Sequence, residues 1–171
     1  AEEFGTCHSG AVRMLEDGLF DKYPCDAIFA MHNMPGHPQG QLLFRDGAMM
    51  ASSDKVRIVL HGRGGHGGVP HKAADPVVAA ASLVMALQTV VSRNVDPQQT
   101  AVVTVGVLQA GHANNVIPQS AELELSVRTL DSAVRKRLKQ RIVNLAHAHA
   151  QSFELTAEVD YQRGYAVLVN T

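Results

Sequence analysis

The sequence predicts an α+β protein in which two helices cover one face of an antiparallel sheet. Two observations lead to this prediction. Between residues 55 and 163, apolar side chains recur at every second position in four segments and at every third or fourth position in two others. These segments follow one another as strand, helix, strand, strand, helix, strand, an order that is typical of two-layer sandwiches.

The composition narrows the class of protein. The 171 residues include 15 basic and 16 acidic side chains, a net charge of -1, so the chain lacks the positive field that holds nucleic acids or anionic membranes. Its apolar runs, such as residues 77–81 and 83–87, are short and interrupted, and the N-terminus opens with Ala-Glu-Glu. We therefore expect no membrane span, no signal sequence, and a cytoplasmic location.

The first strand and the first helix of the sandwich are expected at residues 55–62 and 76–91. Apolar and polar residues alternate in the strand, so one of its faces is buried. Asp75 can cap the helix, and Pro76 suits its first position because no needed hydrogen-bond donor is lost there. Apolar residues continue almost all the way round this helix, which predicts that it is covered on more than one side.

The remaining elements follow the same two patterns. Valines alternate with threonine and glycine at residues 100–110, and apolar and polar residues alternate strictly at residues 120–129. Asp131 can cap a helix at residues 132–151, which has apolar residues at spacings of three and four and basic residues on the opposite face. Alternation returns at residues 154–163 and predicts a last strand.

Together these six elements predict a ferredoxin-like βαββαβ domain, in which the second strand lies at an edge of the sheet. That strand has four valines, no charge and no proline at residues 100–108, which is typical of an edge that pairs with another chain. We therefore expect a homodimer that forms through edge strand 100–108 and helix 76–91.

The first 54 residues do not predict a core of their own. We expect a short amphipathic helix at residues 10–19, a buried strand at 27–31 and another short strand at 41–44. So few elements cannot bury enough apolar surface to fold independently. This part of the chain is expected to belong to a larger unit.

Glu2, Glu3 and His32 could form part of a metal site. Adjacent carboxylates diverge in direction, so one can bind a metal ion while the other accepts a proton from water. His32 follows a predicted strand at the end where α/β active sites are built. Carboxylate and imidazole ligands suit zinc, manganese or cobalt. A solvated terminal pair and a histidine that caps a strand account for the same residues.

Two further groups could bind a ligand. The glycine-rich loop 62–71 lacks the spacing of a phosphate-binding loop but could present His66 or His71; a mobile turn with exposed histidines fits the same sequence. Asn115, in a loop between two strands, and Arg128, on a polar strand face, are residue types that bind carboxylates. A turn and a surface ion pair also account for these two residues.

Several motifs occur in a fixed order almost from end to end of the chain: Ala-Glu-Glu at 1–3, Ala-Met-His-Asn-Met-Pro-Gly at 30–36, Gly-Arg-Gly-Gly-His-Gly at 62–67, Asn-Val-Ile-Pro at 115–118 and Val-Arg-Thr at 127–129. In type, order and spacing they resemble the aminoacylase and hippurate hydrolase family of dinuclear metallo-amidohydrolases. The sequence after Glu3 is bulkier than the glycine-rich sequence usual in that family.

For the ends of the chain, the resemblance implies an incomplete α/β catalytic domain of the zinc-exopeptidase type. Residues 1–53 would be its metal-binding part, and the chain would start to return to this domain at residues 166–171. Glu2 would be the general base. Glu3 and His32 would be ligands in a centre of two divalent metal ions. These ions would be zinc, manganese or nickel. Because family members are longer than this chain, the remaining ligands are expected in other segments.

For residues 54–165, the resemblance implies a lid and dimerisation domain. His66 would stabilise the oxyanion in the active site of the other subunit, and Asn115 and Arg128 would hold the carboxylate of an N-acyl amino acid. The implied activity is metal-dependent hydrolysis of the amide bond of N-acyl amino acids or similar small amides. The alternative is a non-catalytic dimerisation module that lacks a complete metal site.

Overall fold

The computed structural model describes residues 10–171; Glu2 and Glu3 lie outside the described residues. The elements are α1 (Gly10–Glu16), α2 (Leu19–Lys22), β1 (Gly47–Met50), β2 (Asp54–His61), β3 (Gly65–His66), the 3-10 turn η1 (Pro70–Lys72), α3 (Pro76–Asn94), β4 (Ala101–Ala110), β5 (Val116–Ile117), β6 (Ser120–Thr129), α4 (Ser132–Ser152), β7 (Thr156–Arg163) and β8 (Leu168–Asn170).

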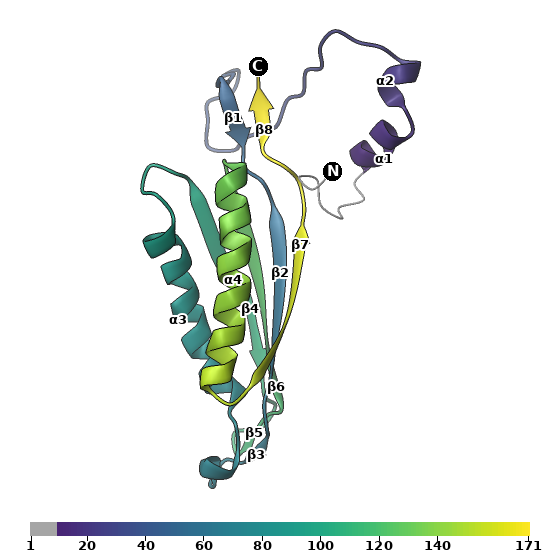
Figure 1. Cartoon of the computed structure of the whole chain (residues 1–171). Helices are drawn as coiled ribbons and strands as arrows, with labels where there is room; N and C mark the ends of the chain where they lie inside the picture. The colour runs from purple at the N-terminus through teal and green to yellow at the C-terminus, as the bar shows by residue number, and fades with distance from the viewer. Residues whose placement is uncertain (1–9) are drawn as a thin grey trace.

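The main body is an antiparallel sheet of four strands in the order β4-β6-β2-β7. Helices α3 and α4 lie side by side on one of its faces (Figure 1). This arrangement confirms the ferredoxin-like prediction, and β4 lies at an edge of the sheet as expected. All six predicted elements are present, and their ends agree with the prediction to within three residues.

The core lies between this sheet and the two helices. In the register of β2 with β6, Ile58 faces Leu123 and Leu60 faces Ala121, so alternate residues of both strands point toward the helices. The helices fill the layer with buried residues at helical spacing: Leu83, Leu87, Val90, Leu138, Ile142 and Ala146. The opposite face of the sheet carries exposed charged pairs, as its polar alternation predicted.

Helix α3 differs from expectation in two ways. With 19 residues it is long and apolar enough to cross a membrane by length and composition, so the argument that every apolar run is too short is wrong here. Its inner residues are buried against the sheet, as expected of a core helix. Helix α3 packs against both the sheet and α4, but its outer side keeps Val78 and Met85 exposed, at 55% and 70%, and no described residue covers that side.

The alternation in β4 breaks at Gly106. Val105 pairs with Leu125, whose side chain is on the helix side of the sheet. Val107 pairs with Glu124, on the opposite side, because a bulge inserts one extra residue between the two valines. The regular valine alternation predicted for this strand is therefore wrong from Gly106 onward.

The helix predicted at residues 10–19 is interrupted. Gly18 has a φ of 77°, in the left-handed region that glycine adopts without strain, and the chain turns there between α1 and α2. Both short helices stand apart from the sheet (Figure 1).

The two strands predicted at residues 27–31 and 41–44 are wrong. Both segments are irregular, and their aromatic side chains Phe29 and Phe44 are 93% and 86% exposed. A strand needs a neighbour for its backbone groups and a layer for its apolar side chains, and the described residues offer these segments neither. No residue between 10 and 46 is buried.

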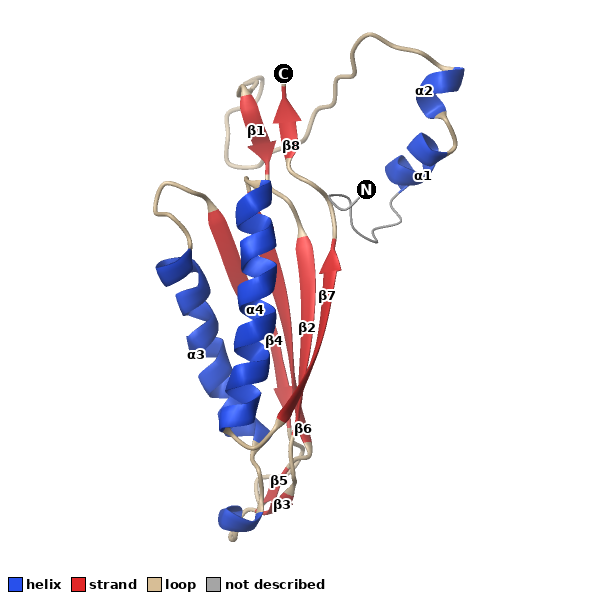
Figure 2. Cartoon of the chain, viewed as in Figure 1, coloured by secondary structure: helices blue, strands red, loops and turns tan. Residues whose placement is uncertain are grey.

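The sheet has two differently built ends. At one end, residues 51–53 and 164–167 connect it to a ribbon of β1 and β8; we call residues 51–54, 127–129 and 161–165 the junction end. At the opposite end, β3 and β5 form a second ribbon, which with its loops we call the tip (Figure 2).

Candidate functional site

The tip brings His66 and Asn115 together. The pairing of β3 with β5 puts His66 beside the loop that carries Asn115, and the backbone N–H of Gly67 donates to the Asn115 carbonyl oxygen at 2.8 Å. The chains approach closely, since a Cβ on Gly64 would lie 2.7 Å from the Ile117 carbonyl oxygen. Two candidates that are distant in sequence therefore share one ribbon.

His66 has a defined tautomer. The backbone N–H of Gly68 donates to its Nδ1 at 2.9 Å. Because a nitrogen that accepts a hydrogen bond has no proton, the neutral imidazole carries its proton on Nε2. The side chain is exposed, so this N–H can donate to a ligand. A neutral donor of this kind can stabilise negative charge that develops on a carbonyl oxygen. His71 lies exposed in the neighbouring turn η1.

Arg128 lies at the other end of the sheet. It is the next-to-last residue of β6, and its side chain is exposed. Strand β6 starts at Ser120, next to the tip, and eight residues of extended chain span roughly 26 Å. One copy of the chain therefore cannot bring Arg128 and His66 to the same small ligand.

His32 stands alone. It lies in the irregular segment after α2, is exposed, and its Nδ1 is 2.7 Å from the Asn33 carbonyl oxygen. Within residues 10–171, no group of three or more His, Cys, Asp or Glu side chains is placed to hold a metal ion. A single imidazole suits zinc, manganese or nickel as a ligand but does not make a site. The described residues do not assemble a two-metal centre.

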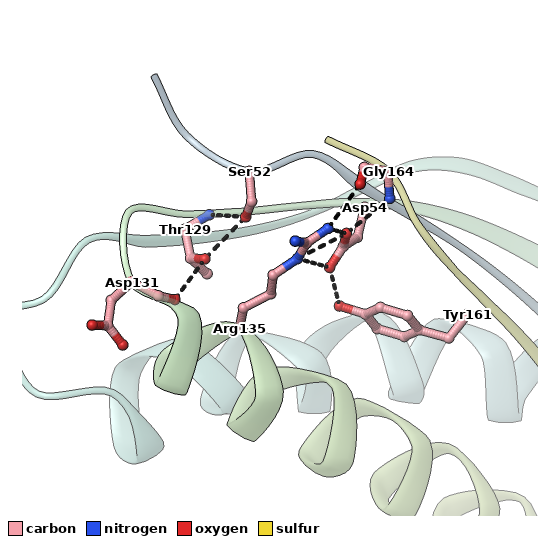
Figure 3. A network of polar contacts seen from close by, with 7 residues as sticks. All are labelled: Ser52, Asp54, Thr129, Asp131, Arg135, Tyr161 and Gly164. Carbon is pink, nitrogen blue, oxygen red and sulfur yellow. Dashed lines mark hydrogen bonds and ion pairs between the residues drawn. The ribbon is translucent and has the colours of Figure 1, made fainter. Parts of the chain in front are cut away.

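The junction end holds a buried polar cluster that the sequence analysis missed (Figure 3). Arg135 of α4 and Asp54 of β2 form an ion pair with 2.5 Å between Nη2 and Oδ1, and their side chains are 3% and 0% exposed. The Tyr161 hydroxyl donates to the Asp54 carboxylate at 2.9 Å. The sequence does carry a signal for this cluster. Asp54 lies two residues before Val56 and so belongs to the inward face of β2, and Arg135 lies three residues before Leu138 and so shares the inward face of α4. The prediction that the basic residues of α4 all face outward is wrong for Arg135.

The cluster fixes the protonation of Tyr161. Burial raises the pKa of its hydroxyl far above the usual range, and the negative charge of Asp54 and the hydrogen bond to it raise the pKa further. The hydroxyl therefore stays protonated and remains a donor to the carboxylate.

Comparison with known proteins identifies the family of this chain. Residues 51–154, which run from the connection before β2 past the end of α4, match the family model of a peptidase dimerisation domain, that of M20 peptidases. This chain belongs to the M20 peptidase family.

The M20 chain is 47% identical over 151 residues to hippurate hydrolase of Campylobacter jejuni, a match that covers 88% of this chain and 39% of that protein. It is 39% identical over 170 residues to N-acetyl-L-cysteine deacetylase of Bacillus subtilis, a match that covers 99% of this chain and 40% of that protein. The crystal structure of a dinuclear metal binding M20 peptidase from Bacillus subtilis is similar to this chain, with a TM-score of 0.73 and 30% sequence identity. The match covers 98% of this chain and 41% of that structure. The resemblance to the hippurate hydrolase family is thus confirmed, and the chain spans about two fifths of the length of these relatives.

Proposed function

We propose that the whole protein is a metal-dependent amidohydrolase that cleaves the amide bond of N-acyl amino acids or similar small amides. The observation that carries this proposal is the 47% identity to hippurate hydrolase over 88% of the chain. Residues 54–165 would be the lid and dimerisation domain. Residues 1–53 and 166–171 would belong to the catalytic domain, whose remaining segments lie outside this chain.

In the proposed reaction, Glu2 accepts a proton from the attacking water and then gives it to the leaving amine. The Nε2–H of His66 donates to the oxyanion that forms at the substrate carbonyl. Two divalent metal ions, bound in part by Glu3 and His32, would polarise the carbonyl and lower the pKa of water.

The lid geometry supports a site that two subunits share. If the β4 edges of two copies pair antiparallel about a two-fold axis, one sheet is inverted relative to the other. The tip of each copy then lies level with the junction end of its partner. Arg128 of one subunit and His66 with Asn115 of the partner subunit would meet at one substrate, with Arg128 and Asn115 binding its carboxylate.

The dimer can be tested on the outer side of α3. Met85 is exposed, so Met85→Lys adds a charge to the proposed interface without removing a core contact. We expect this variant of the 171-residue protein to sediment as a monomer where the unchanged protein is a dimer. Asn144→Lys adds the same charge to the exposed face of α4 and should leave the dimer intact. A Met85→Lys dimer of unchanged affinity would contradict the proposed interface.

The chemistry can be tested in the full-length protein. Glu2→Gln keeps the size of the side chain but removes the base, so we expect hydrolysis of an N-acyl amino acid to fall by a factor on the order of 10²–10⁴ with metal content unchanged. Full activity of Glu2→Gln would rule out this mechanism.

Subunit mixing tests the shared site. His66→Ala and Arg128→Ala proteins should each be inactive. A mixed dimer has one site with both substituted residues and one with neither, so random mixing should restore about a quarter of the wild-type activity. No recovery would contradict a site that is built from Arg128 of one subunit and His66 of the other.

A second candidate is a non-catalytic dimerisation module. The observation that favours it is that residues 10–171 contain the complete lid sheet but no group of three metal-binding side chains. Metal analysis and amide hydrolysis on the 171-residue protein test it, and this candidate predicts neither stoichiometric metal nor turnover. Tight binding of two metal ions per chain would exclude it.

A further inference from the structure

At the junction end, the connection from β1 to β2 (residues 51–53) is hydrogen-bonded to the sheet. The backbone N–H of Ser52 donates to the Thr129 carbonyl oxygen at 2.8 Å, and the Thr129 N–H donates to Ser52 Oγ at 3.2 Å. The two hydroxyl groups lie 3.0 Å apart (Figure 3), and both residues are fully buried. Ser52 therefore continues the pairing of β2 with β6 by two residues beyond the end of β2.

The connection from β7 to β8 (residues 164–167) is also hydrogen-bonded at the junction end. The Gly164 N–H donates to Asp54 Oδ1 at 3.2 Å, and the Gly164 carbonyl oxygen accepts from Arg135 at 3.1 Å. The Ser53 N–H donates to the Tyr165 carbonyl oxygen at 3.0 Å. A Cβ on Gly164 would collide with the Ser53 carbonyl oxygen, so glycine is needed for the two connections to lie side by side.

Arg128 lies between two residues that these contacts hold in place. The residue before it, Val127, pairs with Asp54, and the residue after it, Thr129, is hydrogen-bonded to Ser52. The backbone on both sides of Arg128 is therefore held by the segment that enters the lid from β1. The hydroxyl of Ser52 holds Thr129 from the buried side, while the Arg128 side chain extends from the exposed side.

We propose that the buried Ser52–Thr129 pair is a positioning device for Arg128. It sets the place of the arginine relative to the connection that leads to the β1–β8 ribbon, and so relative to the proposed catalytic domain. The inference rests on the proposed function, in which Arg128 binds the substrate carboxylate. Small displacements of a group that orients a substrate cost binding and rate, so a residue that fixes such a group acts on the substrate without contacting it.

Ser52→Ala in the full-length protein is the test. It removes the acceptor of the Thr129 N–H but keeps the backbone bond from Ser52. We expect KM for an N-acyl amino acid to rise by about two- to tenfold, the range for one hydrogen bond, with a smaller change in kcat. Ser126→Ala, on β6 but on the open face of the sheet, is the matched control and should leave KM unchanged.

Two readouts separate positioning from general weakening of the fold. In an Arg128→Gln background, Ser52→Ala should cause no further rise in KM, because the group it positions is gone. Hydrolysis of an N-acyl amine that lacks the carboxylate should be the same for Ser52→Ala and the unchanged protein. If Ser52→Ala does not fold, Thr129→Val, compared with the hydroxyl-retaining Thr129→Ser, makes the same comparison.

Equal rises in KM with and without Arg128, or no rise at all, would overturn the positioning role while leaving the proposed hydrolysis in place. Absence of N-acyl amino acid hydrolysis by the unchanged full-length protein would instead overturn the proposed function, and the positioning role with it.

Discussion

The two ends of the lid sheet are held by different means. The junction end is fixed by buried side chains, above all the Asp54–Arg135 ion pair and the Ser52–Thr129 hydroxyls. The tip is held by backbone hydrogen bonds and close-packed glycines, and the side chain of His66 stays exposed. The difference teaches that buried side-chain contacts can hold one end of a sheet while backbone contacts hold the other, and each end still keeps an exposed polar side chain, Arg128 at the junction end and His66 at the tip.

The largest effect is expected at the junction end. Arg135→Ala leaves the Asp54 carboxylate buried without its cation, so the free energy of unfolding should fall by about 3–5 kcal/mol. Arg57→Ala breaks an exposed ion pair with Glu122 on the open face of the same sheet and should cost much less, because solvent screens an exposed pair. Urea unfolding of the 171-residue protein measures both. Similar losses would remove the distinction between buried and exposed pairs.

A smaller and local effect is expected at the tip. Gly64→Ala pushes β3 away from the Ile117 carbonyl oxygen and should cost about 1–3 kcal/mol as an overpacked contact. The amide of Gly67, which bonds to Asn115, should then exchange its hydrogen faster, while the amides of the junction end are unaffected. Gly106→Ala is the control, because a Cβ added at Gly106 would meet nothing within 4 Å apart from its chain neighbours. Unchanged exchange at Gly67 would contradict the close approach.

The smallest effect is expected on the open face between the two ends. The hydrogen bond from Arg57, with the charges of Arg57 and Lys55, lowers the pKa of Glu122. A carboxyl with a lowered folded-state pKa stabilises the fold above its unfolded pKa and loses this contribution as the pH falls through the folded value. Glu122→Gln should therefore slightly flatten the decline of stability between about pH 6 and pH 3. Unfolding curves at low and high salt test this, since salt screens an exposed pair.

Much of the lid could be predicted from local patterns. Strand parity and helical spacing fixed the six elements, and both predicted caps are present: Asp75 accepts from the Val77 N–H and Asp131 from the Val134 N–H, each at 2.8 Å. The same reasoning failed at residues 27–31, because apolar composition does not supply the neighbouring strand that a strand requires. It also failed at Gly106, since a bulge is not visible in a pattern of alternating valines.

By itself the sequence determined the order of the elements, the inward faces of the lid and, through its motifs, the residues that could carry chemistry. Only the tertiary structure decided which of them meet. It placed His66 beside Asn115 and both far from Arg128, and it joined Asp54 to Arg135 across 81 residues of chain. The reason is physical: periodicity is set by backbone geometry within a segment, whereas a contact between segments depends on the register of a whole sheet and the packing of its helices.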